Sequence, residues 1–307
     1  MHARTGSSVT IRFSLPDEAL RPFITTFYCT DVKCSMLQPW LEDYLMPEWA
    51  NLRFLDATSV QTVIGAGEVS TSPDFAVTGP TSRAMRFRIG SGRSWGIGLM
   101  PAGWALLTGV SAAEYADRSV DGRADPAFAL FTPLADALAA SNEDYAGELA
   151  MIQSHMARLC AAAPSIDPAI AALNAALVDP DTVTVADLAA RLGVAVRSVE
   201  RLSRRAFGFA PKLLLRRQRF LRSLERFMLD PDLTWLGALD CHYHDQSHFV
   251  RDFQRFMGMC PSDYARKDKP LLAAATQARM AAAGHAMQGL HDPEGSIGVS
   301  TGARETA

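Results

Sequence analysis

The sequence predicts an α+β protein, in which an N-terminal β-rich mixed domain is followed by an all-α domain with tandem helix-turn-helix units. Three observations lead to this prediction. Short apolar runs separated by turn residues fill the first half, helical periodicity fills the second, and a pattern in the second half repeats at a spacing of about 50 residues. With 307 residues the chain is long enough for two domains. We expect divisions at residues 1–165, 166–268 and 269–307.

The composition is that of a folded globular protein. Hydrophobic residues make up 48% of the chain and charged residues 21%, unlike a disordered protein. No apolar run reaches the roughly 18 to 20 residues that a membrane span needs, and the first residues lack the apolar core of a signal peptide. Five cysteines at irregular spacing do not indicate a disulfide framework. We therefore expect a cytoplasmic protein with no membrane partner.

Strand signals dominate the first half. Apolar and basic residues alternate from Met85 to Ile89, the period of a half-buried strand, and Gly90 to Gly92 offers a turn after it. We therefore expect a hairpin with the next apolar run. The expected strands are 23–29, 51–55, 60–64, 75–78, 85–89 and 95–100.

Helices are expected at both sides of the domain boundary and less order at the C-terminus. Alanine-rich, apolar-periodic segments predict helices at 133–140 and 145–162, and a proline-bearing junction at 163–168 marks the boundary. From 269 to 307 the chain is rich in alanine and glycine, without a sustained apolar face beyond Leu271 and Leu272. We expect frayed helix and then a flexible tail there.

The charge is unevenly distributed. The whole chain has a formal charge of -3, but from Arg191 to Arg226 eleven Lys and Arg residues face only two Glu. Ten of the eleven are arginine, whose planar fork suits bidentate contacts to phosphate and guanine. A basic helix is often only a solvated face, so charge alone leaves both interpretations open.

The repeat is carried by residues of the same type in the same order. Phe207-Gly208-x-x-Pro211 reappears as Met257-Gly258-x-x-Pro261, and Arg201 and Arg205 reappear as Arg251 and Arg255. This pattern indicates two copies of one supersecondary unit.

The first copy reads as a helix-turn-helix. Thr184 and Asp187 are spaced as a helix-opening cap, and Gly193 supplies the left-handed backbone that ends this helix. A second helix follows with Val199 and Leu202 inward, and such a helix enters the major groove of DNA. Two core helices that meet at a glycine give the same pattern, but the arginines on the outer face favour DNA.

The second copy is expected to begin with a helix at 233–239. Asp245 is positioned to cap the next helix. Its buried-face candidates are Phe249, Phe253 and Phe256. A long helix from Pro211 to Leu229 lies between the copies, and would hold two recognition helices about one duplex turn, roughly 34 Å, apart.

The second copy also carries a family resemblance. The run from Asp245 to Phe253, DQSHFVRDF, followed by Gly258-x-x-Pro261-x-x-Tyr264, resembles the signature of the AraC/XylS family of bacterial transcription regulators. The resemblance implies a transcription factor, expected to be an activator, that binds double-stranded DNA without a cofactor. RNA polymerase and a second copy of the chain are further implied partners. The expected DNA-binding residues are Arg197, Ser198, Glu200, Arg201, Arg205, Gln246, Ser247, His248, Arg251 and Arg255.

Two positions depart from the family pattern. His242 stands at the turn glycine of the second unit, so this turn must be strained or reshaped. Ala195 stands where a capping serine is usual, so the first recognition helix is expected to fray slightly.

The first half is similar, more weakly, to the N-terminal sensor domains of the same family. The similarity lies in Met46 to Phe54, in Gly79-Pro80 and in Gly96 to Trp104. It implies a β-rich domain that binds a small effector or serves only for dimerisation. The candidate effector-binding residues are Trp49, Arg53, Trp95 and Trp104. Tryptophan is more often part of a core, so both roles of this half stay open.

Other chemistry has less support. Cys29 and Cys34 have no second cysteine pair to complete a zinc site. Four further potential ligands are crowded together, namely Cys241, His242, His244 and His248. A turn histidine and a DNA-facing His248 explain this group better, so we expect no metal site. We identify no catalytic constellation and expect no enzyme. The alternative is an enzyme or a metal-dependent sensor fused to a DNA-binding module.

Overall fold

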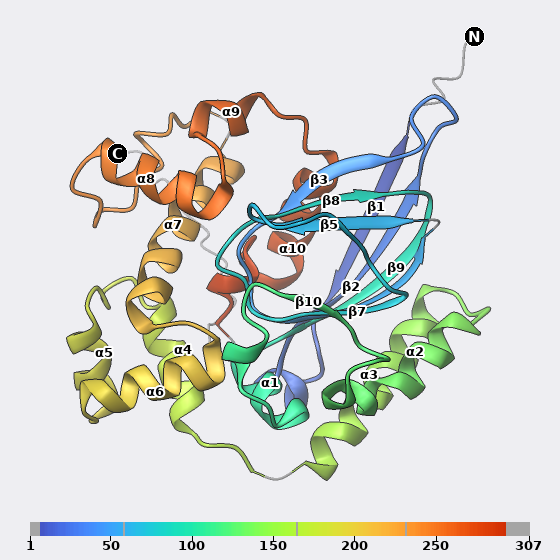
Figure 1. Ribbon diagram of the computed structural model, residues 1–307, viewed down its shortest axis with the longest axis horizontal. Helices are drawn as coiled ribbons and strands as arrows, with labels where there is room; N and C mark the ends of the chain where they lie inside the picture. Colours follow the sequence, from blue (N-terminus) through green and yellow to red (C-terminus); the bar gives the residue numbers. More distant parts are fainter. Residues whose placement is uncertain (1–6, 58, 164, 231, 293–307) are drawn as a thin grey trace, which may run out of the picture.

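The computed structural model describes residues 7–292 except 58, 164 and 231. Figure 1 shows two β-sheets that form the N-terminal half and a group of helices that forms the C-terminal half. The predicted α+β class is therefore confirmed.

The two sheets of the N-terminal half are antiparallel throughout. The larger has the strand order β1 (Ser8–Ser14), β2 (Ile24–Lys33), β9 (Gly92–Leu99), β4 (Asn51–Ala57), β7 (Phe75–Thr78) and β10 (Ser119–Asp121). The smaller has the order β3 (Leu41–Leu45), β8 (Met85–Ile89), β5 (Val60–Ile64) and β6 (Ser70–Thr71).

The expected hairpin between β8 and β9 is wrong. Both strands form, and β8 shows the expected alternation of buried and exposed residues. However, β8 pairs with β3 and β5 in the smaller sheet, whereas β9 pairs with β2 and β4 in the larger. The turn at Gly90 to Gly92 therefore carries the chain from one sheet to the other. Alternation identifies the buried face of a strand but not its pairing partner.

Helices cover the outer face of the larger sheet. They are α1 (Pro101–Thr108), α2 (Thr132–Ala139) and α3 (Tyr145–Ala162). Ile152 and Met156 of α3 and Leu134 of α2 belong to one buried cluster with Phe75 and Ile97 of the sheet. Both helices predicted in this part of the chain are present, and they close the core on the outer side of the sheet.

The C-terminal half consists of helices arranged around one long helix. They are α4 (Ala169–Val178), α5 (Val185–Leu192), α6 (Val196–Phe207), α7 (Pro211–Leu229), α8 (Gln246–Met257) and α9 (Pro261–Arg266). In Figure 1, α7 runs between the group formed by α4, α5 and α6 and the group formed by α8 and α9.

The two halves share buried apolar clusters. Trp49 of the N-terminal half lies in one cluster with Phe207 and Leu214. Met46 lies in another cluster with Phe220 of α7. The helices are therefore packed onto the sheets by apolar contacts, and a change in one half has a physical route to the other.

The expectation of a flexible tail from residue 269 is wrong for residues 270–292. They form helix α10 (Pro270–Ala283) and a short 3-10 turn (Gln288–Leu290), which we call the C-terminal arm. Leu271 and Leu272 are buried, and the Asp43 carboxylate accepts hydrogen bonds from their N–H groups at 2.8 and 3.0 Å. The two buried leucines and the Asp43 carboxylate therefore attach the start of a segment with a weak apolar face to the smaller sheet. Residues 293–307 lie outside the described part of the chain.

Within the described part of the chain, no helix has the length and apolar character that crossing a membrane requires.

Candidate functional site

The first helix-turn-helix unit has the predicted ends. The Asp187 N–H donates to Thr184 Oγ1 at 3.1 Å, and the Thr184 N–H donates to Asp187 Oδ2 at 2.7 Å, which completes the capping box of α5. Gly193 ends α5 with a φ of 66°. Val199 and Leu202 of α6 are buried, as predicted. Helices α5 and α6 therefore form the expected helix-turn-helix.

The outer face of α6 is exposed and strongly basic. Arg197, Glu200, Arg201 and Arg205 are exposed, and Ser198 is half-buried. The Arg205 Nη2 lies 3.4 Å from Asp167 Oδ2. Exposed ion pairs of this kind are weak, so another anion can displace the Asp167 carboxylate. Ala195 has no side-chain oxygen to cap α6, and the helix begins directly after it.

The second unit presents α8 in a similar way. The Asp245 carboxylate accepts a hydrogen bond from the His248 N–H at 2.6 Å and so caps α8 as predicted. The inward residues are Phe249, Phe253 and Phe256, all buried. On the other face, Gln246, Ser247, Arg251 and Arg255 are exposed and His248 is half-buried.

The expected first helix of this unit at 233–239 is wrong, because the segment forms turns. The Trp235 ring stacks on Phe227 with 3.4 Å between centroids and meets Phe253 edge-on at 5.1 Å. Leu236 is 61% exposed. Gly237 disfavours a helix by about 1 kcal/mol relative to alanine. The aromatic contacts of Trp235 therefore hold this segment against the protein, where the sequence predicted the apolar face of a helix.

The turn at His242 is reshaped rather than strained. Asp117 is the one described residue other than glycine with a positive φ. The Asp240 Oδ1 accepts a hydrogen bond from the His242 N–H at 3.0 Å, and Asp240 Oδ2 accepts one from Arg222 Nε at 2.6 Å. Burial raises the pKa of Asp240, but Arg222 and His242 outweigh it and hold the pKa below its ordinary value.

The same turn gathers three possible metal ligands. Atoms of Asp240, Cys241 and His242 lie within 4.8 Å of one another. Asp240 is buried and already paired with Arg222, and His242 Nδ1 lies 3.0 Å from the same carboxylate. These contacts explain the group as a turn that is attached to α7 through Arg222.

A buried carboxylate that sequence reasoning missed fastens α8 to α7. Asp252 is fully buried, forms an ion pair with Arg216, and lies 3.7 Å from Arg219 Nη2. The Tyr243 hydroxyl donates to Asp252 Oδ2 at 3.1 Å. Because both arginines are on α7, these contacts hold α8 against the helix that separates the two units.

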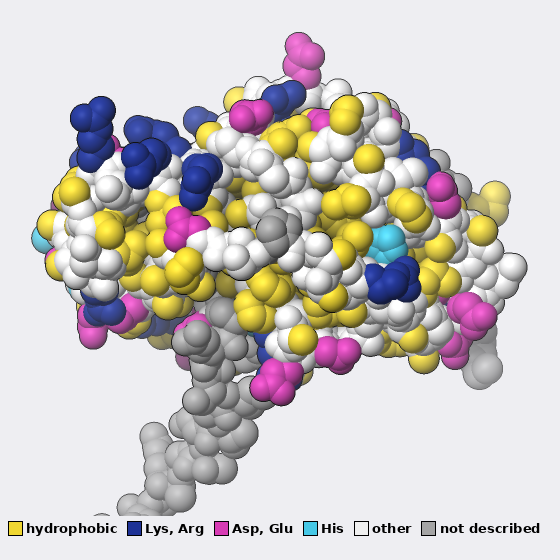
Figure 2. Space-filling view, turned by 90° about the horizontal axis from the view of Figure 1, so that it is seen from below, with side chains coloured by type: hydrophobic (Ala, Val, Ile, Leu, Met, Phe, Trp, Pro, Cys, Tyr) yellow, Lys and Arg dark blue, Asp and Glu magenta, His cyan; other side chains and the backbone are white. Residues whose placement is uncertain are grey.

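A basic groove lies over α7, between the start of α5 and α8. It is lined by Thr182, Val183, Thr184, Val185, Lys212, Leu215, Arg216, Arg219, Arg222, His242, His248 and Arg251. Burial and three neighbouring arginines, against Asp252, lower the pKa of His248, which favours the neutral imidazole. Figure 2 shows Lys and Arg side chains gathered over the helical end of the molecule. This surface is suited to a polyanion that runs past both units.

A cavity of about 170 Å³ lies between the two sheets. An apolar cavity of about 150 Å³ is large enough to bind benzene. The smaller sheet contributes mainly apolar side chains, namely Leu45, Val60, Met85, Phe87 and Ile89. The larger sheet contributes most of the polar ones, namely Tyr28, Thr30, Asn51, Arg53, Thr78 and Ser94. The hydrogen-bonding groups of the cavity therefore lie mainly on the wall formed by the larger sheet, which also contributes apolar side chains such as Phe13 and Trp95.

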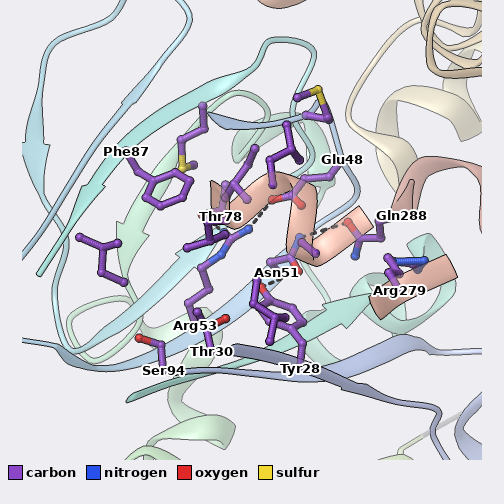
Figure 3. Close-up of a pocket in the computed structure, with 18 of the residues that line it drawn as sticks. Tyr28, Thr30, Glu48, Asn51, Arg53, Thr78, Phe87, Ser94, Arg279 and Gln288 are labelled. Atoms are coloured by element: carbon purple, nitrogen blue, oxygen red, sulfur yellow. Dashed lines mark hydrogen bonds and ion pairs between the residues drawn. The ribbon is translucent and has the colours of Figure 1, made fainter. Parts of the chain in front are cut away.

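The polar wall is organised around Arg53. Its guanidinium forms an ion pair with Glu48, and Nη1 donates to Thr78 Oγ1 at 2.9 Å. Although burial lowers the pKa of Arg53, Tyr28 and Glu48 raise it above its ordinary value, so the guanidinium stays charged. Figure 3 shows Arg53 reaching into the cavity between Glu48 and Thr78.

The four candidate effector residues separate into two groups. Arg53 and Trp95 line the cavity. Trp49 lies elsewhere, edge-on to Phe207 at 5.5 Å between centroids, and Trp104 lies in the core, donating from Nε1 to the Val110 carbonyl at 3.1 Å.

Sequence reasoning missed the polar cavity residues Tyr28, Glu48, Asn51, Thr78, Arg279 and Gln288. Glu48 and Asn51 lie close to Trp49 in the run from Met46 to Phe54, so the resemblance in that run could have identified them as candidates. Gln288 lies in a segment that the composition assigned to a tail.

Comparison with known proteins identifies part of the chain. Residues 188–267 match the family described as a helix-turn-helix domain. No curated protein matches the chain.

Solved structures resemble the chain at low sequence identity. ToxT from Vibrio cholerae O395 is 10% identical, with a TM-score of 0.39, over 85% of this chain and 97% of that one. Unsaturated fatty acid bound wild-type ToxT from Vibrio cholerae strain SCE256 is 12% identical, with a TM-score of 0.39, over 86% and 96%. The AraC-like transcriptional activator CuxR is 14% identical, with a TM-score of 0.27, over 70% and 95%.

Proposed function

We propose that the chain is a DNA-binding transcriptional regulator, in which the helix-turn-helix domain at residues 188–267 reads DNA through α6 and α8. In this proposal a small, mostly apolar effector in the sheet cavity controls the reading.

The observation that carries the DNA proposal is the pair of exposed faces on one helical frame. Helix α6 presents Arg197 and Arg201 and helix α8 presents Gln246 and Arg251, all exposed. These side chain types form hydrogen bonds with base edges and phosphates. The basic groove on α7 lies between the units and is the surface that would contact the intervening backbone phosphates.

The DNA proposal is tested with single substitutions on the two faces. We expect Arg201→Ala to weaken binding to a duplex recovered by selection, by about 1 to 3 kcal/mol if it contacts a base. Arg158→Ala is the matched control, because Arg158 is exposed on α3 in the N-terminal half. Equal affinities of the two variants, measured by fluorescence anisotropy, would contradict the role of α6.

The effector proposal rests on the two walls of the cavity. An apolar wall favours burial of a hydrocarbon surface, and a few hydrogen-bonding groups opposite it would orient one polar group of the ligand. Arg53 and Trp95 are the sequence candidates that line this cavity. The alternative is that the N-terminal half serves only for dimerisation.

The effector proposal is tested by thermal shift with pools of small molecules. A ligand at 100 times its dissociation constant stabilises the folded protein by about 2.7 kcal/mol. A shift that disappears when the cavity is filled by substitution supports the proposal. A stable dimer with no shift in any pool would favour the dimerisation role. RNA polymerase as a partner is a separate proposal, tested by transcription from a selected site.

A further inference from the structure

We propose that the C-terminal arm, residues 270–292, couples the cavity to the DNA-binding helices, by forming one wall of the cavity and fastening helix α7 at the same time. This inference deepens the proposed function, since it names how occupancy of the cavity would be reported to the DNA-binding half.

The arm is a structural part of the cavity. Leu272, Thr276, Arg279, Met287 and Gln288 all line it. At its start the arm is held by Asp43 of β3, whose carboxylate accepts the Leu271 and Leu272 N–H groups. Near its end Arg279 Nη1 donates to the His285 carbonyl at 3.0 Å and so holds the helix to the following turn. A molecule that enters the cavity therefore touches the arm.

The turn of the arm reaches the polar wall through Gln288. The Asn51 Nδ2 donates to Gln288 Oε1 at 3.1 Å, and the Tyr28 hydroxyl donates to Asn51 Oδ1 at 3.2 Å. Figure 3 shows the chain Tyr28, Asn51, Gln288 along one side of the cavity. A Cβ on Gly98 would lie 2.5 Å from Gln288 Nε2, so this approach depends on a glycine in β9.

The residues next to Gln288 hold α7. The Gln218 Nε2 donates to the Gly289 carbonyl at 2.6 Å. About two turns further along α7, Glu225 Oε1 accepts the Ala286 and Met287 N–H groups at 2.6 and 3.2 Å. Gln218 is buried, and Leu290 packs in one apolar cluster with Leu221. The arm is thus hydrogen-bonded to the cavity on one side and to α7 on the other.

Helix α7 is the element through which a movement of the arm would reach both helix-turn-helix units. Asp252 of α8 is paired with Arg216 of α7, while Leu214 of α7 packs with Val199 of α6. In this proposal the arm has two positions, each associated with a different DNA affinity. A ligand changes DNA affinity only to the extent that it binds one of these arm positions more tightly than the other. The hydrogen bonds at residues 286–289 are where that difference would be transmitted.

The test separates ligand binding from transmission. Gln218→Met keeps the volume of the side chain but removes the donor to Gly289, and Gln218 lies outside the set of residues that line the cavity. Gln277→Met is the matched control, since Gln277 is exposed on α10. The probe is benzene, which an apolar cavity of about 150 Å³ can bind, and its binding is measured by calorimetry. DNA affinity is measured with and without the probe for the full chain and both variants.

We expect the probe to bind all three proteins alike and to change the DNA affinity of the full chain and of the Gln277 variant by about fivefold or more. The Gln218 variant should lose that response. An equal response in all three proteins would overturn the proposal. If the probe does not bind, the effector proposal loses support. The role of the arm is then tested by the DNA affinities of the three proteins measured without the probe. A changed affinity of Gln218→Met alone supports the coupling, and affinities within about twofold of one another overturn it.

Discussion

The Arg217 guanidinium carbon lies 3.9 Å from the centre of the Trp49 ring, so α7 of the C-terminal half contacts the N-terminal half through this side chain. Arg217 is fully buried, and its Nη1 donates to the carbonyls of Thr81 at 3.0 Å and Glu48 at 3.3 Å. Burial lowers the pKa of Arg217 to about 9, which leaves it charged at neutral pH. This buried charge holds the two halves in one arrangement, because separating the halves would break the contacts of Arg217 with Trp49, Thr81 and Glu48.

Arg217→Lys is expected to loosen this contact. Lysine keeps the charge but loses the planar group that lies over Trp49, so we expect the unfolding free energy to fall by about 2 kcal/mol, the size of a desolvated cation–π interaction. Urea unfolding followed by tryptophan fluorescence measures the change. Arg204→Lys, on the exposed face of α6, should change it by less than about 0.5 kcal/mol. Equal effects of the two substitutions would contradict the account of Arg217.

Asp43 gives the arm a pH dependence. Burial raises the pKa of this carboxyl above its ordinary value of 3.8, although the Leu271, Leu272 and Tyr44 amides and Lys269 oppose the rise. The folded state then holds the proton more tightly than the unfolded state. As pH rises from about 3.8 through the folded pKa, the unfolding free energy contributed by this group falls.

Asp43→Asn should remove this dependence, because an amide does not titrate. Its oxygen can still accept from the Leu271 and Leu272 N–H groups, although the bond from the Tyr44 N–H to the second carboxylate oxygen is lost. We expect the stability of the wild type to fall relative to the variant as pH rises from about 3.8 through the raised pKa of Asp43. Urea midpoints at a series of pH values from about 3.8 upward measure the difference. A difference that stays constant, or that favours the wild type as pH rises, would show that Asp43 is not the group responsible.

Arg251→Ala distinguishes a base contact from a phosphate contact. Arg251 is exposed on α8, and its Nε donates to the Ser247 carbonyl at 3.3 Å, an internal bond that DNA can replace. We expect a loss of about 1 to 3 kcal/mol on the selected duplex and a relaxed preference at one base position. Affinities for a set of single-base variants of that duplex provide the measurement. An equal loss on every sequence would assign Arg251 to the backbone.

Ser94→Leu is expected to fill the cavity. The Ser94 hydroxyl is buried and has no hydrogen-bond partner among the described residues, so leucine removes an unsatisfied group while its side chain enters the space. We expect loss of probe binding and a change in stability of up to about 1 to 3 kcal/mol from overpacking. Ser8→Leu, at an exposed position on β1, is the control in the probe titration. Unchanged probe binding in Ser94→Leu would place the probe outside the cavity.

Local signals predicted the helix-turn-helix ends well because each is set by neighbouring residues. The Thr184 and Asp187 cap, the left-handed Gly193 and the Asp245 cap each depend on side chains within a few positions. The run from Asp245 to Phe253 that carries the family resemblance is also local, and it lies within the matched helix-turn-helix domain. What such signals cannot supply is the identity of a distant partner.

The remaining features depend on such partners. The arm is ordered by Asp43, which is 228 residues from Leu271. Asp252 is buried because two arginines of α7 face it, and nothing in its own neighbourhood indicates burial. The segment at 233–239 has helical spacing, but Trp235 finds a stacking partner in Phe227 and the helix does not form. The cavity is likewise lined by strands of both sheets and by the arm, so only Arg53 and Trp95 were reached from sequence.

The most direct test of the central claim is selection of bound DNA from a random duplex pool with the full chain at low and at high salt. Two recognition helices on one rigid frame predict an enriched motif with two short blocks about one helical turn apart, and affinity that falls as salt rises. Salt-sensitive binding without any enriched sequence, in the chain and in residues 165–270 alone, would contradict it, because the basic segment would then be a general polyanion surface.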